Sequence, residues 1–208
     1  NAYNGLTLLG PSSIGGDFSV TAAAIAGSPS SPTTTYHSIS IDSSFSVTGN
    51  TSLTGASIDQ DGPISTNDLY MNATSGSINM PQNNTVFGVA RLNSFLDTTF
   101  TMDNAVLPAF VLGNSSVGGD LTINAPTAIL ELADPNGGSV SAVGAMTLSA
   151  KAITQSVASN IALSADTLAA TATGTSTGGI ALTDPAGGGA PRNTVSSASF
   201  LVAPGKGV

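Results

Sequence analysis

The chain has 208 residues and a net charge of −8, with 8% charged residues, 5% aromatic residues and no Cys. The lack of Cys excludes disulfides, thiolate metal sites and cysteine nucleophiles. The sequence has no run of about 18 apolar residues, so we expect no segment that spans a bilayer. The basic residues are few and scattered, which argues against a nucleic-acid groove and against binding to an anionic membrane surface; they are Arg91, Lys151, Arg192 and Lys206.

The amino-terminal part of the chain alternates apolar and polar residues, as strands with one buried face do. Residues 1–26 predict two closely spaced strands around a turn at Gly10 and Pro11, and residues 36–58 hold the longest clean alternation. The first ten residues contain no initiator Met and no basic leader region. We therefore expect a chain that was processed or cut from something longer.

Residues 59–116 are expected to be irregular or rich in loops, and they begin with the only acidic cluster of the sequence. Asp59, Asp61 and Asp68 in this cluster carry hard oxygen ligands of the kind that Ca²⁺ binds. The cluster lacks the third spaced acid and the distal Glu of an EF-hand, and an ordinary turn of Asp, Gly and Pro explains the same residues. We therefore predict no metal site and no cofactor, with these three carboxylates as the only candidate calcium ligands.

A repeat organises the region from residue 117 to residue 184. Leu121–Ala128, Met146–Ile153 and Ile161–Leu168 each have apolar residues at the first and third positions, Ala at the fifth and a small or aliphatic residue at the eighth. One such unit cannot bury its apolar face alone, but stacked copies can. The repeat predicts strands that stack with Ile123, Leu148 and Leu163 in one inward row.

Looser copies of the same unit start at Leu6, Phe18, Phe45, Ile78 and Phe100, and again after residue 179. Their mean spacing of roughly 22 residues lies in the range of coiling repeat folds. The sequence therefore predicts a single all-β solenoid domain over residues 1–208. A β-sandwich also has short strands at turn-bounded intervals, so it is the alternative fold, with residues 5–10 as a donor strand exchanged between fibre subunits.

The best copies of the repeat are Gly118-Gly119-Asp120-Leu-Thr-Ile-Asn-Ala125 and Gly144-Ala-Met-Thr-Leu-Ser-Ala150. They resemble the repeats of filamentous haemagglutinin and other two-partner-secretion exoproteins, over about a third of the chain. The resemblance implies a right-handed parallel β-helix, export across a Gram-negative envelope, and adhesive or structural work at a cell surface. The secretion domain of that family carries Asn-Pro-Asn-Gly-type motifs, and this chain has Asp134-Pro135-Asn136-Gly137 at a different place.

No catalytic constellation emerges from the sequence. His37 is the only histidine, and no Ser-His-Asp arrangement follows from its spacing. Gly118-Gly119-Asp120 is not followed by the Gly-Lys-Ser/Thr of a phosphate loop, so turn glycines explain it. Four Asn-x-Ser/Thr sequons are candidates for glycosylation. Chance alone gives about this number of sequons in a chain so rich in Asn, Ser and Thr. They lie at Asn50, Asn72, Asn83 and Asn114.

These observations predict a non-enzymatic extracellular protein with a structural or adhesive role, as a segment of a secreted adhesin or fibre. The alternatives are a subunit that polymerises into a pilus-like filament and a carbohydrate-active β-helix. The expected partners are other copies of the chain, or the rest of a longer chain, docked through the end strands. Glycans on a host or neighbouring cell surface are further candidate partners, whereas nucleic acid and membrane insertion are not expected.

Overall fold

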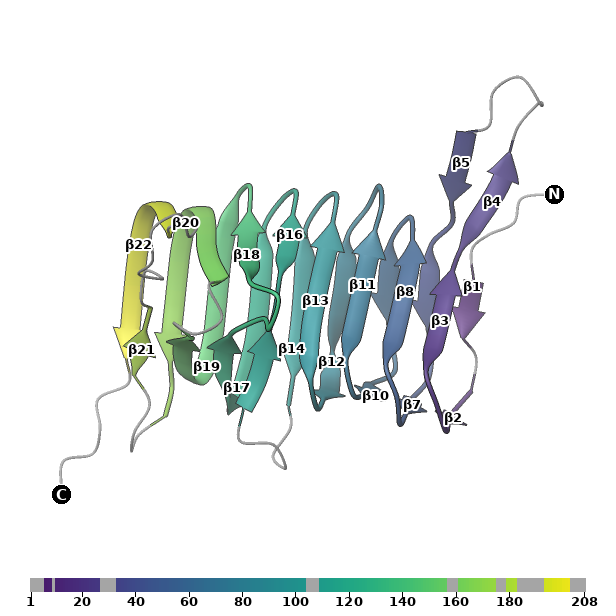
Figure 1. Cartoon of the computed structure of the whole chain (residues 1–208), viewed down its shortest axis with the longest axis horizontal. Coiled ribbons are helices and arrows are strands. Elements are labelled where there is room, and N and C mark those ends of the chain that lie inside the picture. The colour runs from purple at the N-terminus through teal and green to yellow at the C-terminus, as the bar shows by residue number, and fades with distance from the viewer. Residues whose placement is uncertain are drawn as a thin grey trace.

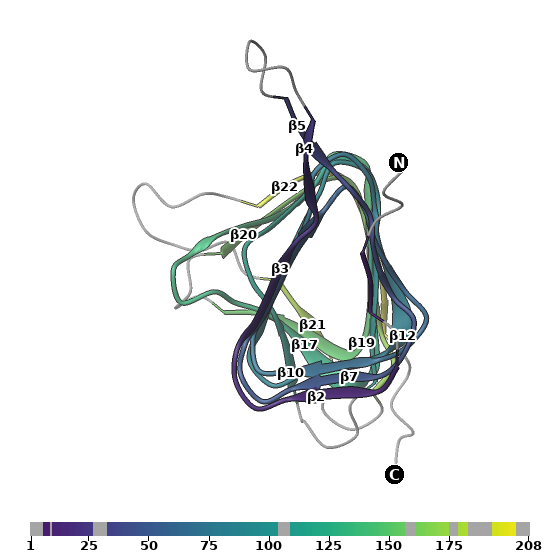
Figure 2. The same cartoon turned by 90° about the vertical axis from the view of Figure 1, so that its right-hand side faces the viewer.

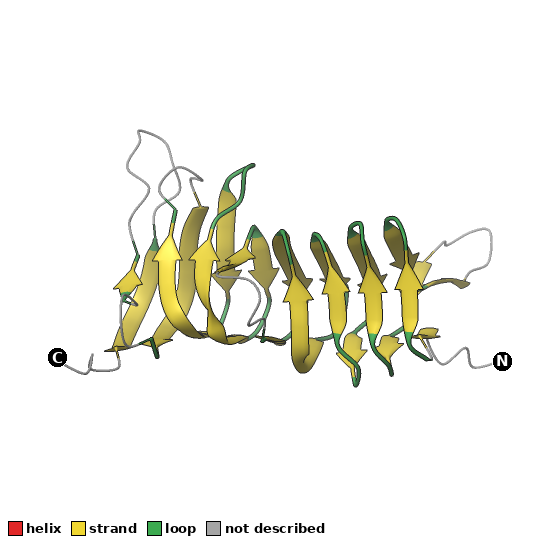
Figure 3. Ribbon diagram, turned by 90° about the horizontal axis from the view of Figure 1, so that it is seen from below, coloured by secondary structure: helices red, strands yellow, loops and turns green. Residues whose placement is uncertain are grey.

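The computed structural model describes residues 6–8, 10–26, 33–103, 109–156, 161–174, 179–182 and 193–202. The expected all-β fold is confirmed, since the described residues form strands and no helix (Figure 3). Twenty strands form one parallel sheet, and β4 and β5 form a separate antiparallel hairpin. The described part of the chain therefore contains no helix long and apolar enough to span a membrane.

The strands run along the chain as follows. The first eleven are β1 (Leu6–Leu8), β2 (Ser12–Ile14), β3 (Phe18–Thr21), β4 (Ala23–Ala26), β5 (Thr33–Tyr36), β6 (Ile39–Ile41), β7 (Phe45–Val47), β8 (Thr51–Gly55), β9 (Ile58–Gln60), β10 (Ile64–Thr66) and β11 (Leu69–Ala73). The others are β12 (Ile78–Val86), β13 (Val89–Ser94), β14 (Thr98–Met102), β15 (Ala109–Leu112), β16 (Ser115–Val117), β17 (Leu121–Leu132), β18 (Gly138–Ala142), β19 (Ala145–Gln155), β20 (Ile161–Ala172), β21 (Ile180–Ala181) and β22 (Thr194–Val202).

Strands inside the large sheet pair in parallel with strands about one repeat before and after them. Leu69 of β11 pairs with Thr51 of β8, 18 residues before it, and with Ala90 of β13, 21 residues after it. The strands therefore lie side by side along the long axis of the molecule (Figure 1). Seen along that axis, they outline a triangle from which the β4–β5 hairpin projects (Figure 2).

The predicted open right-handed β-helix, a solenoid, is wrong. In the second half of the chain the pairings run from β13 through β15, β17, β19, β20, β18 and β16 back to β13. Seven parallel strands thus close into a barrel, and the other strands of the sheet lie outside it. The ring closes because β17, β19 and β20 have 12, 11 and 12 residues, so the two halves of each strand pair with different neighbours.

The alternative β-sandwich is not supported either, because the large sheet is a single parallel one rather than two packed antiparallel sheets. The strand that a sandwich would donate to a neighbour falls on residues 5–10, of which Gly5 and Leu9 lie outside the described residues. Its described part, β1, pairs with β6 of the same chain, with Leu6 opposite Ile39.

The predicted inward row is confirmed for two of its three members. Ile123 pairs with Leu148, and both side chains are fully buried. Leu148 is followed by Ala170 and not by Leu163, which pairs with Val140 instead. The physical reason is that Leu168-Ala-Ala-Thr-Ala172 alternates like Ile161-Ala-Leu-Ser-Ala165, so the pattern alone does not choose between the two registers.

The core is a continuous interior of aliphatic side chains that alternate with outward polar ones along each strand. Residues 59–116, where we expected loops, contain β10–β15 and the start of β16, and they contribute buried side chains such as Leu69, Met71 and Leu92. Phe100 and Phe110 are also buried and stack with ring centroids 5.6 Å apart. Because every fully buried aliphatic side chain stabilises the fold by about 1.5–3 kcal/mol, this interior provides most of the driving force for folding.

Candidate binding faces

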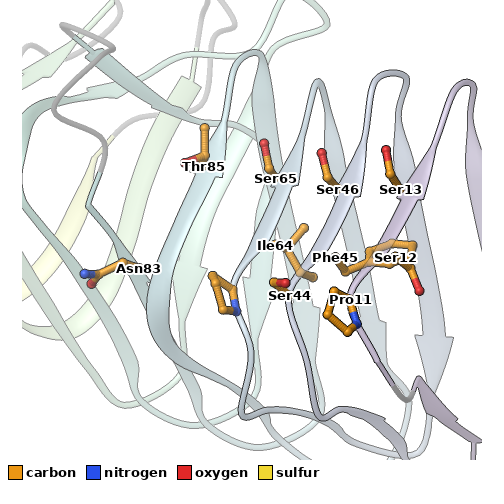
Figure 4. Close-up of a pocket in the computed structure, with 11 residues that line it drawn as sticks. Pro11, Ser12, Ser13, Ser44, Phe45, Ser46, Ile64, Ser65, Asn83 and Thr85 are labelled. Atoms are coloured by element: carbon orange, nitrogen blue, oxygen red, sulfur yellow. The ribbon is translucent and has the colours of Figure 1, made fainter.

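The outer face of β2, β7, β10 and β12 carries a row of hydroxyl groups. Register places Ser13 beside Ser46, Ser46 beside Ser65 and Ser65 beside Thr85. Figure 4 shows these four side chains along successive strands, with their hydroxyl-bearing ends directed away from the core. Neighbouring strands lie about 4.8 Å apart, so the row is regular.

A second row runs parallel to this one and leaves a shallow recess between them, which we call groove 1. This row consists of Pro11, Ser44 and Asn83 (Figure 4), together with Pro63, which precedes Ile64 as Ser44 precedes its partner Phe45. The side chains of Phe45 and Ile64 are buried beneath the recess. The recess has a volume of about 400 Å³. No ionisable side chain is found among the described residues that line it, so groove 1 offers hydroxyls, amides and apolar surface but no charge.

A larger recess, groove 2, crosses β13, β16, β18, β20 and β22 and has a volume of about 680 Å³. One wall is a row of outward serines, in which Ser116 pairs with Ser141 and Ser141 with Ser164. The other wall is formed at the turns that follow β13 and β18, where Phe95 is 64% exposed and Val143 is 74% exposed. Groove 2 therefore has a hydroxyl wall and an apolar wall.

The acidic side chains near the turns are used to hold neighbouring strands together. Oδ1 of Asp68 accepts a hydrogen bond from the N–H of Val89 at 2.8 Å, and Oδ1 of Asp97 accepts one from the N–H of Asp120 at 2.9 Å. Asp120 in turn accepts a hydrogen bond from the N–H of Ala145 at 2.7 Å. A glycine precedes each of the three N–H donors, and a Cβ at Gly88, Gly119 or Gly144 would collide with the approaching carboxylate.

The candidate calcium ligands are placed separately by the structure. Asp59 points outward from β9 and accepts a hydrogen bond from the Ser57 hydroxyl at 3.2 Å, and Asp61 is exposed in the turn that follows. Asp68 is engaged with Val89 as described. Within the described ranges, no three His, Asp or Glu side chains lie close enough together to hold a metal ion.

The strongest electrostatic contact joins Arg91 of β13 to Asp134 after β17. Arg91 Nε donates to Oδ2 at 2.7 Å and Nη2 donates to Oδ1 at 3.2 Å, while the N–H groups of Asn114 and Asn136 donate to the same two oxygens. The Asp134 side chain is 1% exposed. Burial alone would raise the pKa of Asp134, but the hydrogen bonds from Arg91, Asn136 and Asn114 outweigh it and hold the pKa below its ordinary value.

His37 and the four sequon asparagines have no arrangement that suggests catalysis. His37 follows β5, and its Nε2 is buried with no hydrogen-bond partner among the described residues. Asn50 and Asn114 are exposed, and each accepts a backbone hydrogen bond through Oδ1, from Asp68 at 3.1 Å and from Ser139 at 3.2 Å. Asn83 is exposed beside groove 1, whereas Asn72 is half-buried in β11.

Sequence reasoning missed the two grooves, the ion pair and two amide pairs at the bends of the strands. Asn84 Nδ2 donates to Gln60 Oε1 at 3.1 Å, and Asn193 Nδ2 donates to Gln155 Oε1 at 2.9 Å. Gln60 and Gln155 occupy positions where the strand period calls for an apolar residue, and this break in the pattern was the available signal.

Comparisons with known proteins return no matching family model, no matching curated protein and no matching solved structure.

Proposed function

We propose that the chain is a non-enzymatic structural and adhesive protein of an extracellular surface, which holds its partner through the grooves on its outer faces. The observation that carries this proposal is the pair of regular, nearly uncharged recesses lined by serine hydroxyls, groove 1 and groove 2. Long rows of equivalent groups suit a repetitive partner, because each repeat of the partner meets the same chemistry on the next strand.

The placement of the ionisable groups supports the same proposal. The carboxylates of Asp68, Asp97, Asp120 and Asp134 are occupied by backbone N–H groups or by Arg91. Acid–base catalysis requires a titratable group within hydrogen-bond reach of the substrate. The described lining residues of the two grooves include a single ionisable one, Asp166 in groove 2.

Attachment of protein-coated beads tests the proposal. Beads that carry the folded chain should adhere under flow to at least one of three surfaces: polystyrene, a bacterial lawn or an epithelial monolayer. Beads with the heat-denatured chain serve as the control, because they present the same composition without the grooves. The proposal is contradicted if beads with the folded chain adhere no better than beads with the denatured chain on all three surfaces.

A second candidate, a self-polymerising filament subunit, is favoured by the last described strand. Along β22 the side chains of Phe200, Leu201 and Val202 are exposed, and the strand pairs with β20 along one edge. The register of β22 is with β20 alone among the described strands. A second copy whose β1–β3 edge continued the parallel sheet would cover this apolar surface, since an open edge is a template for further pairing.

Sedimentation velocity tests this second candidate. If copies join through β22, the sedimentation coefficient should rise with protein concentration, and Leu201→Lys should return the protein to a monomer. Tyr70→Lys is the matched control, because Tyr70 is also an exposed large side chain but lies in β11, away from β22. A monomer at every concentration, or equal effects of both substitutions, would contradict the filament candidate.

A further inference from the structure

We infer that groove 2 binds a straight, uncharged glycan of β-1,4-linked pyranose rings, which lies along the long axis of the molecule across β13, β16, β18, β20 and β22. The inference rests on the proposed adhesive function and names the class of partner. It is carried by three features of the groove: its two chemically different walls, its charge and its straight course.

The two walls match the two sides of a pyranose ring. A sugar ring presents an apolar face of C–H groups and an edge of hydroxyl groups. Phe95 and Val143 provide exposed apolar surface on one wall of groove 2, and an exposed aromatic face packs well against such C–H groups. The Ser116 and Ser164 hydroxyls on the other wall have no hydrogen-bond partner among the described residues, so they are available as both donors and acceptors.

A glycine lies between the two apolar side chains. Gly118 stands between Phe95 and Val143 in successive turns, because Val117 pairs with both Ser94 and Ala142. A Cβ at Gly118 would collide with the backbone oxygen of Phe95, so glycine allows these turns to stack closely. The apolar wall of groove 2 therefore carries exposed apolar side chains on both sides of Gly118 and none at Gly118 itself.

The charge of the groove selects against anionic partners. None of the described residues that line groove 2 is Lys or Arg, and the one ionisable residue, Asp166, is acidic. The chain as a whole carries a net charge of −8. An acidic polysaccharide would be repelled, whereas a neutral one would bind with little dependence on salt.

The course of the groove selects a straight chain. Its five strands pair in parallel at a spacing of about 4.8 Å and follow one another along the long axis of the molecule (Figure 1), so it extends over roughly 19 Å in that direction. This length accommodates several linked sugar rings. Equatorial β-1,4 linkages give an extended ribbon that follows such a path, while α-1,4 linkages give a coil that leaves it after one or two rings.

Isothermal titration calorimetry with defined hexasaccharides tests this inference. Cellohexaose, xylohexaose and chitohexaose are the neutral β-1,4-linked probes, maltohexaose is the coiled probe, and hexagalacturonate is the anionic probe. At least one of the first three should bind at least tenfold more tightly than the last two, with a dissociation constant that changes less than twofold between 50 mM and 500 mM NaCl. Failure of all three to bind at millimolar concentration would overturn the inference.

Phe95→Ala is the diagnostic variant, because this exposed ring can be removed without opening the core. It should weaken binding at least tenfold. Phe87→Ala is the matched control, since Phe87 is also an exposed phenylalanine at a turn, 56% exposed, but does not line groove 2. Equal losses for both variants, or no loss for Phe95→Ala, would overturn the inference. Bead adhesion without hexasaccharide binding would leave the adhesive function standing and remove only the glycan as its partner.

Discussion

Asp134→Asn should destabilise the protein strongly, although it changes neither the size nor the shape of the side chain. Each oxygen of Asp134 accepts two hydrogen bonds: Oδ2 from Arg91 Nε and the Asn114 N–H, and Oδ1 from Arg91 Nη2 and the Asn136 N–H. In asparagine one of these oxygens becomes an NH₂ group, which cannot accept, so two donors lose their acceptor.

The magnitude follows from the burial of the pair. A buried donor left without an acceptor costs about 1–3 kcal/mol, and removal of one partner of a buried ion pair costs about 3–5 kcal/mol. The Arg91 side chain remains 24% exposed, so water compensates part of the loss. We therefore expect a loss of roughly 3 kcal/mol in the free energy of unfolding, measured by urea denaturation followed by circular dichroism.

The matched control is Asp61→Asn, which makes the same chemical change at an exposed carboxylate and should shift the free energy by less than about 0.5 kcal/mol. Stability should also depend on pH through Asp134. Its pKa is lower in the folded chain than in the unfolded one, so its contribution is complete above the ordinary carboxyl pKa of about 4 and is lost as the pH falls below it. In Asp134→Asn the free energy of unfolding should therefore fall less steeply as the pH drops below about 4. An unchanged pH dependence, or equal stability losses for Asp134→Asn and Asp61→Asn, would refute the reasoning.

Three further predictions concern the strands and the acidic turn. Leu148→Asp places a charge at a fully buried position and should lower the free energy of unfolding by roughly 4 kcal/mol or more. Thr147→Asp lies on the exposed face and should change it by less than about 0.5 kcal/mol. Equal melting temperatures of the two variants would contradict the register. Gly119→Ala pushes a Cβ against the Asp97 carboxylate and should lower the free energy of unfolding by about 2 kcal/mol. An unchanged free energy of unfolding would show that the carboxylate does not hold this turn. Millimolar calcium should leave the melting temperature unchanged, because Asp59, Asp61 and Asp68 are not gathered into a site, and a shift that Asp61→Asn abolishes would reverse this conclusion.

Alternation in the sequence was sufficient to predict the buried faces of the strands in the regular repeat after residue 117. Leu121, Ile123 and Ala125 face inward as their spacing predicts, and they pair with the equivalent positions Met146, Leu148 and Ala150. The closure of the ring could not be predicted in this way. It depends on where β17, β19 and β20 bend, and the bends are set by contacts between segments rather than by the composition of one segment.

The ion pair and groove 2 were also beyond the reach of sequence patterns. Arg91 and Asp134 are 43 residues apart in the chain, and the pairing of β15 with both β13 and β17 brings them together. The apolar wall of groove 2 comes from turns that are two strands apart, with Gly118 between them. Phe95 lies in the region where we expected loops, and only the fold shows that its side chain is exposed.

The central claim is that the outer grooves, and not a chemical centre, carry the function. The most direct measurement compares bead adhesion of the wild-type chain with that of Ser46→Asp/Ser116→Asp, which places one charge in each groove at exposed positions. The account predicts that this variant keeps its fold but loses at least nine-tenths of the adhesion, while Thr147→Asp, which places a single charge on an outward face that lines neither groove, retains it. Full adhesion of the doubly charged variant would contradict the account.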